Sequence, residues 1–231
     1  MMSTRTNAPW LAVGVALLGA PALHASFVDL DGDLGNNTWN GGVVVSPINT
    51  ATTTPFTHVS ANGDITGDVI ATNTGGANFE LTITNVVFNA LNTAGVTIIN
   101  LLVRHSYEID PTTFPGPYLA EHMIDGTWST APSNSVDLES FHGTGVLTIS
   151  PPPLSLTNSL MTTSFNLGPT SASVPLTTNI YTIQMNLRLA IDGAGTITLP
   201  NSADSFATYI PTPATAALLA LGGLASTRRR R

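Results

Sequence analysis

Histidine and acidic side chains gather between residues 104 and 142, which holds three of the chain's five histidines. Imidazoles and carboxylates can bind a metal ion, and two carboxylates can serve glycoside hydrolysis. The spacings His105-x-x-Glu108 and Glu139-x-x-His142 suit one face of a helix, whereas their surroundings have the pattern of strands and loops. We therefore interpret the set as solvated loop residues, with a metal or hydrolase site as the alternative. The residues are His105, Glu108, Asp110, Glu121, His122, Asp125, Asp137, Glu139 and His142.

A second group of carboxylates lies near the N-terminus, where Asp29, Asp31 and Asp33 alternate with other residues. The group resembles the start of calcium loops of the dockerin or thrombospondin-repeat kind, in which alternating carboxylates offer hard oxygens to one cation. An EF-hand loop would have Gly where Leu34 stands and Glu where Asn40 stands. The alternatives are therefore a calcium site and an acidic turn without a cation.

Four aromatic residues are candidates for stacking against a sugar ring. A saccharide site usually needs two or more aromatic faces exposed along a groove or a flat surface. Each of these residues is, however, also of a type that commonly packs in a core or at its rim. The candidates are Trp39, Tyr107, Tyr118 and Trp128.

The composition excludes several kinds of chemistry. Cysteine is absent, so the chain has no disulfide, thiolate metal site or cysteine nucleophile. Lysine is absent too, which excludes a P-loop lysine and a Schiff-base lysine. Residues 26–210 hold all 14 acidic residues and only two basic ones, Arg104 and Arg188, for a formal charge of −12. Binding to nucleic acid or anionic lipid is therefore disfavoured, because both need basic residues.

The segment that must position these groups has a strand-like pattern. Apolar residues alternate with polar ones over 181–191 and again over 79–84, as expected for strands with one buried face. Turn pairs such as Asn62-Gly63 separate the strand candidates. We expect eight to ten short strands in one all-β domain, an antiparallel sandwich or jelly roll, with a β-helix as the weaker alternative. Further strand candidates are 43–45, 65–71, 96–109, 146–149 and 161–167.

Two proline-containing stretches interrupt this pattern. Residues 110–117, with the sequence DPTTFPGP, are expected to form a loop. The three prolines at 151–153 must stop a strand, because proline cannot donate to a sheet ladder. A boundary there would leave about 57 residues beyond it, a marginal size without disulfides. We therefore expect one domain over 26–209 with a stiff crossover.

The N-terminal residues 1–25 have the pattern of a secretory signal peptide. Arg5 lies in a short polar start, an apolar run follows over 8–23, and small residues come next. The apolar run is short for a helix that crosses a bilayer. We expect a signal helix that is cleaved after Ala22 or Ala25, with an uncleaved anchor as the alternative.

The C-terminal residues 210–231 combine an apolar run with a basic end. Residues 214–227 are uncharged and mostly apolar, and Arg228, Arg229, Arg230 and Arg231 follow directly. As a helix, that run would reach roughly 21 Å, which is short for a bilayer core of about 30 Å. The arginines cannot enter hydrocarbon and would stay on the cytoplasmic side. The pattern predicts a short transmembrane helix that anchors the exported chain transiently.

Pro211, Thr212 and Pro213 precede this run, and the whole tail resembles a PEP-CTERM sorting signal. In that family a Pro-Glu-Pro motif comes before a short transmembrane helix and a basic end, and the chain also carries a signal peptide. Thr212 stands where Glu is typical. The resemblance implies export by the general secretion machinery and processing by an exosortase. It implies no particular activity for the domain in between.

From these features we expect an exported protein of the cell surface or extracellular matrix. Its expected role is structural, within the exopolysaccharide matrix, with no turnover and no cofactor. The first alternative is a surface module that binds polysaccharide or calcium. The second is a secreted hydrolase that uses paired carboxylates. The expected partners are the secretion machinery, an exosortase and extracellular polysaccharide, and nucleic acid is not among them.

Overall fold

The computed structural model is all-β throughout the part of the chain that it describes. The described residues are 25–43, 50–128, 134–144, 147–157, 164–200 and 202–211. The expected signal helix, the expected transmembrane helix over 214–227, Thr212, Pro213 and Arg228 to Arg231 lie outside them. Among the described residues, no helix is long and apolar enough to cross a membrane.

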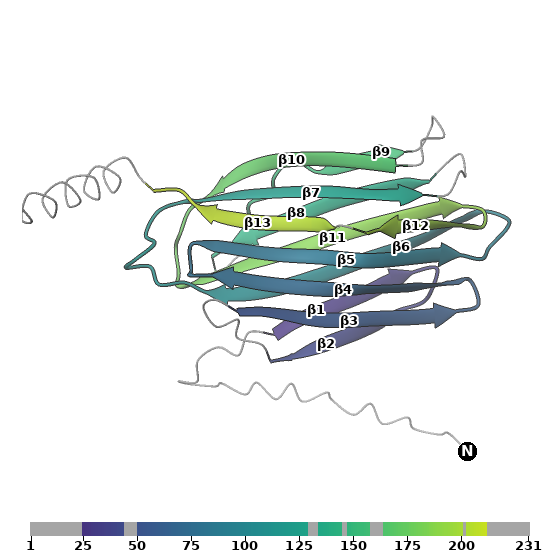
Figure 1. The fold of residues 1–231 in the computed structure, drawn as a ribbon, viewed down its shortest axis with the longest axis horizontal. Coiled ribbons are helices and arrows are strands. Elements are labelled where there is room, and N and C mark those ends of the chain that lie inside the picture. Colours follow the sequence, from purple (N-terminus) through teal and green to yellow (C-terminus); the bar gives the residue numbers. More distant parts are fainter. Residues whose placement is uncertain are drawn as a thin grey trace, which may run out of the picture.

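Within the described residues, thirteen strands form two antiparallel sheets that pack face to face (Figure 1). The first sheet has the order β2 (Asn37–Val43), β1 (Ala25–Gly32), β6 (Val96–Glu108), β11 (Ile180–Asp192), β8 (Ser135–Gly143) and β9 (Leu154–Thr157). The second has the order β10 (Ser164–Val174), β7 (Tyr118–Trp128), β12 (Gly195–Leu199), β5 (Asn78–Ala90), β4 (Gly63–Thr74) and β3 (Thr50–Ser60). The last strand, β13 (Ala203–Tyr209), lies between β5 and β7 in line with β12, and it pairs with both β5 and β7.

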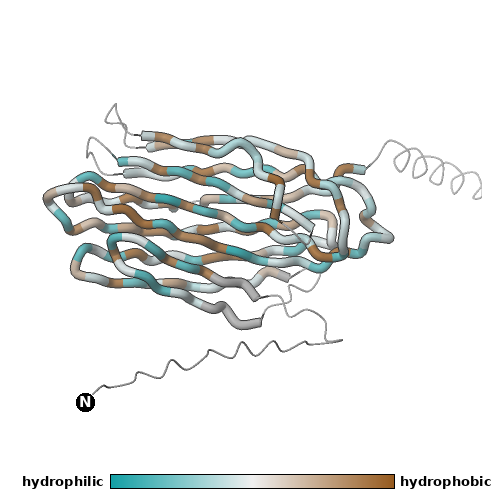
Figure 2. The backbone as a smooth tube through the Cα atoms, turned by 180° about the vertical axis from the view of Figure 1, so that it is seen from behind, coloured by the Kyte–Doolittle hydropathy of each residue, from teal (hydrophilic) through white to brown (hydrophobic). Residues whose placement is uncertain are grey.

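Period-two alternation explains both the strands and the core. Along β11 the side chains of Ile183, Met185 and Leu187 are buried, whereas those of Gln184 and Asn186 between them are partly exposed. Figure 2 shows the same change between hydrophobic and hydrophilic residues along many strands. Burial of one face of each sheet against the other is the main stabilising term, at roughly 25 cal/mol for each Å² of apolar surface. The predicted antiparallel β-sandwich is thus confirmed.

The strand count differs from the expected eight to ten. Thirteen strands form because short, Thr- and Ser-rich segments such as β9 and β12 also join the ladders. The predicted strand at 146–149 is wrong for the described residues 147–149, which contain only an isolated bridge between Ile149 and His142. Propensity alone underestimates such strands, because their stability comes from neighbouring strands.

The proline-containing stretches behave as expected. The backbone over 110–117 forms turns, and the Asp110 carboxylate accepts hydrogen bonds from the hydroxyls of Thr112 and Thr113. The three prolines at 151–153 lie outside any strand and lead into β9. The chain beyond them adds strands to both sheets, so the two sides of this break share one core.

Candidate functional site

Strand alternation separates the histidines of 104–142 from the carboxylates of that stretch. The side chains of His105, His122 and His142 are fully buried between the sheets. The carboxylates alternate with them and face solvent, on the second sheet for β7 and on the first for β8. Among the described residues, no three His, Asp or Glu side chains are placed to hold a metal ion. The structure does not assemble the hypothetical metal or hydrolase set from Glu121, Asp125, Asp137, Glu139 and these histidines.

Two of the histidines instead join the sheets through buried hydrogen bonds. His142 on β8 of the first sheet has Nε2 2.9 Å from the Ser205 hydroxyl on β13 of the second. His122 on β7 has Nδ1 2.8 Å from the Ser140 hydroxyl on β8. All four side chains are fully buried. These polar contacts cross a largely apolar interface, as does the hydrogen bond from the Tyr107 hydroxyl on β6 to the Glu80 carbonyl on β5, so they help to align the two sheets.

The Pro152 carbonyl determines where the proton lies on His122. A carbonyl can only accept, so His122 Nε2 donates to it over 2.8 Å. His122 Nδ1 then accepts from the Ser140 hydroxyl. His142 Nε2 lies 3.2 Å from the Ser140 oxygen and 2.9 Å from the Ser205 oxygen, and its Nδ1 lies 3.1 Å from the Tyr181 hydroxyl. These contacts form one hydrogen-bonded chain of groups between Tyr181 and Pro152.

Burial keeps both imidazoles neutral near pH 7. Burial, together with repulsion from His122, lowers the pKa of His142 to about 3. Burial also lowers the pKa of His122, although the Pro152 carbonyl opposes this shift. A serine between two imidazoles resembles an activated nucleophile, but the Ser140 side chain is fully buried. We interpret this cluster as a structural link between the sheets.

The acidic group near the N-terminus occupies a strand and the turn that follows it. Asp29 lies on β1, and its carboxylate accepts a hydrogen bond of 2.7 Å from the Thr38 hydroxyl on β2. Asp33 lies in the turn after β1, and its carboxylate accepts from the backbone N–H of Ile98 at 2.8 Å. Asp31 points to solvent between them. The backbone is thus extended where a calcium loop would curve around its ion.

The four predicted sugar-stacking residues do not form an exposed surface. Tyr107 and Tyr118 are fully buried in an aromatic cluster around Phe79. Trp128 is buried against Phe165. Trp39 is half-buried, with its ring packed on Phe56 and His58. These aromatic rings therefore belong to the core or its rim.

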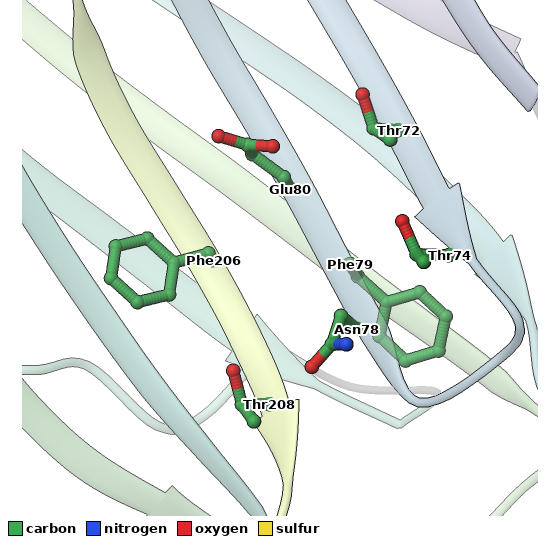
Figure 3. Close-up of a pocket in the computed structure, with 7 residues that line it drawn as sticks. All are labelled: Thr72, Thr74, Asn78, Phe79, Glu80, Phe206 and Thr208. Carbon is green, nitrogen blue, oxygen red and sulfur yellow. The ribbon is translucent and has the colours of Figure 1, made fainter.

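The structure places a different aromatic ring on an open face. Phe206 on β13 projects from the outer face of the second sheet, beside a hollow of about 300 Å³ (Figure 3). In the register of the sheet, Phe206 lies between Glu80 on β5 and Glu121 on β7. The other residues that line the hollow are Thr72, Thr74, Asn78, Phe79 and Thr208.

This outer face is strongly acidic. Six of the chain's 14 acidic residues lie on it, whereas Arg104 and Arg188 are both on the opposite sheet. Burial and repulsion from Asp204 raise the pKa of Glu80, and burial also raises the pKa of Asp204. The Thr82 side chain hydrogen-bonds to both carboxylates and opposes these shifts. The six are Asp64, Asp68, Glu80, Glu121, Asp125 and Asp204.

Comparisons with known proteins name no family for this chain. No family model and no curated protein matches it. Among solved structures, the chain is similar to the "Structure of infectious bursal disease virus Gt strain", with 11% identity, a TM-score of 0.29 and coverage of 80% of this chain and 59% of the other. It therefore spans 59% of that chain's length. It is also similar to a protein among "carbohydrate- binding modules from the beta-sandwich super family", with 11% identity, a TM-score of 0.22 and coverage of 80% and 84%.

The side chains around the Phe206 hollow suit a polar ligand that has one apolar face. An aromatic ring packs against the C–H face of a sugar, and neighbouring carboxylates accept hydrogen bonds from its hydroxyls. The alternation of residues in β13 could have identified Phe206 from the sequence. In β13, Ala203, Ser205 and Ala207 alternate with Asp204, Phe206 and Thr208, and the first three are buried. Phe206 is thus the large apolar residue on the polar face.

Proposed function

We propose that this chain is exported and displayed at the cell surface or in the extracellular matrix, where it acts without turnover. Its two ends support the proposal, because residues 1–25 have the pattern of a signal peptide and 210–231 that of a PEP-CTERM tail. The general secretion machinery would export the chain, and an exosortase would process the tail near Pro211. A charge of −12 over residues 26–210 is consistent with solubility outside the cell.

We further propose that the sandwich binds extracellular polysaccharide through the outer face of its second sheet. The observation that carries this is the Phe206 ring beside an open hollow, with carboxylates on the strands at either side. Hydroxyl groups of Thr72, Thr74 and Thr208 add donors and acceptors there. A neutral or cationic polysaccharide fits this face, because an anionic one would be repelled by the six carboxylates.

Export and tail processing are tested by mass spectrometry of protein recovered from the surface of its native host. The recovered chain should begin near residue 26 and end near Pro211, and a strain without exosortase should retain the arginine tail. Recovery of the intact 231-residue chain from the cytosol would contradict the proposal.

Polysaccharide binding is tested by affinity electrophoresis of the surface-recovered protein in gels that contain exopolysaccharide from the host. Phe206→Ala should remove most of the retardation, because the stacking face is lost. Phe141→Ala is the matched control, since Phe141 is a half-buried phenylalanine on the outer face of the other sheet. Equal retardation of wild type and both variants would exclude the Phe206 face as the binding site.

A further inference from the structure

The strands at the outer edges of both sheets carry no charge. β2 and β9 end the first sheet, and β3 and β10 end the second. None of these four strands contains Asp, Glu, Lys or Arg, although the chain has 14 acidic residues. Natural proteins commonly protect an edge strand with charge, because its free N–H and C=O groups can pair with another chain.

The longest two of these strands have the same length, although β10 has a register shift between Leu167 and Thr170 in its pairing with β7. β3 and β10 both have 11 residues, and they lie at opposite edges of the same sheet. Every neighbouring pair between them is antiparallel, and five such steps separate the two, so β3 and β10 run in opposite directions. A second copy shifted along the sheet would therefore place its β10 antiparallel to β3 of the first copy. This is the favoured pairing of strands.

The first sheet would permit the same shift. β2 and β9 are also separated by five antiparallel steps and therefore also run in opposite directions. β2 contacts β3 at one side of the sandwich, and β9 contacts β10 at the other (Figure 1). A single translation of the molecule thus brings uncharged edges together in both layers.

The hairpin of β3 and β4 shows which backbone groups of β3 do not pair with β4. Ser60 and Gly63 are paired across a two-residue turn and form a hydrogen-bonded pair, and such pairs alternate along a ladder. The N–H and C=O groups of Thr53, Thr57 and Val59 therefore point away from β4. Pro55 falls in the same set, where its missing N–H costs no bond to β4.

We propose that copies of this chain join edge to edge, with β3 of one copy pairing with β10 of the next, into an open filament. The acidic outer faces repel each other, so lateral contact through the faces is disfavoured and the neutral edges are left for association. The junction uses two different edges and does not close on itself, so addition can continue at both ends.

Introduced cysteines test the junction, because the native chain has no thiol of its own. Thr57→Cys is combined in the full chain with a cysteine at one exposed position of β10, and bacteria that express it are treated with a short bismaleimide crosslinker. At least one register should give a ladder of dimers, trimers and larger species on a denaturing gel. The exposed β10 positions to be scanned are Ser164, Asn166, Ser171 and Ser173.

Thr66→Cys is the matched control for Thr57→Cys. Thr66 lies directly opposite Thr57, on the same face but one strand further in. It should give no ladder with any β10 cysteine. If Thr57→Cys gives no more multimers than this control in all four registers, the proposal is wrong. It is also wrong if Thr57→Cys alone forms dimers in equal yield, since that would mean pairing of β3 with β3.

A backbone variant separates strand pairing from mere proximity. Thr53→Pro, added to the ladder-forming variant, removes one N–H from the free edge and leaves the bonds to β4 intact. The yield of trimers and larger species should fall roughly fivefold or more, the effect of one lost hydrogen bond. Thr53→Val keeps the N–H and should leave the yield unchanged. An unchanged yield with Thr53→Pro would overturn the proposed pairing.

Discussion

The Tyr181 hydroxyl lies 3.1 Å from Nδ1 of His142, and both side chains are fully buried. This contact begins the run of hydrogen bonds that passes through Ser140 and His122 to the Pro152 carbonyl. His142 also meets Ser205 of the opposite sheet. The Tyr181 side chain is thus connected through His142 to Ser205 of the opposite sheet.

Removal of that phenol should destabilise the fold. Tyr181→Phe removes the hydrogen-bond partner of the buried His142 Nδ1, so the free energy of unfolding should fall by about 1–3 kcal/mol. Urea denaturation measures the change. Tyr209→Phe is the matched control, because the buried Tyr209 hydroxyl has no hydrogen-bond partner among the described residues and its loss should be close to neutral. Equal destabilisation by the two variants would contradict this role of Tyr181.

Stability should depend on pH through the buried imidazoles. The pKa of His142 is lowered from 6.5 to about 3, so between these values the unfolded chain binds a proton that the folded chain does not. Its contribution is complete above pH 6.5, and it falls by about 1.4 kcal/mol for each pH unit below that value. His122, whose pKa is also lowered, acts in the same direction.

Urea denaturation over a series of pH values should therefore show stability that decreases from about pH 7 to pH 5. The carboxyls of Glu80 and Asp204 have raised pKa values and act in the opposite direction at lower pH, where the folded chain binds their protons more readily. Stability that stays constant over the upper range would show that these histidines titrate normally.

Gly126 should not tolerate a side chain. A Cβ atom there would lie 2.6 Å from the Thr198 carbonyl oxygen and 2.7 Å from both Leu199 Cδ2 and Phe165 Cζ. Gly126→Ala should therefore cost about 1–3 kcal/mol through displaced neighbours. Thermal denaturation measures this, with the neighbouring exposed Thr127→Ala as the control. A melting temperature as high as that of the control would mean that β12 shifts enough to accommodate the added methyl group.

The ion pair between Arg188 and Asp137 should contribute little. The guanidinium nitrogen lies 2.8 Å from the carboxylate, but the two side chains are 42% and 35% exposed. Arg188→Gln should cost less than about 1 kcal/mol, and the coupling energy with Asp137→Asn should shrink as salt is added. A double-mutant cycle at low and high salt measures it. A large coupling energy that does not change with salt would contradict this expectation.

The sequence predicted the layers of this fold better than its details. Alternation over 181–191 identified β11 because one face of that strand is almost wholly apolar. The short strand β9 was missed because its residues are stabilised by β8 rather than by their own pattern. The order of strands in each sheet depends on contacts between distant residues, which local periodicity does not report.

The candidate site was harder to foresee, for a related reason. Residues His105 to His142 are close in sequence, but neighbouring residues in a strand face opposite sides. The imidazoles therefore face the core and the carboxylates face solvent, although the two kinds of residue are close along the chain. Phe206 and Glu80 are brought together by pairing of β13 with β5, across more than a hundred residues. Recognition of the hollow thus required knowledge of the sheet order.

The place of β13 bears on the proposed anchoring of this chain through its C-terminal tail. β13 is the last described strand before Pro211, and it lies between β5 and β7 with a ladder on each side. A pull on the proposed tail would have to shear two ladders together, whereas an outermost strand could be peeled from a single ladder. The domain would therefore resist tension applied at that end.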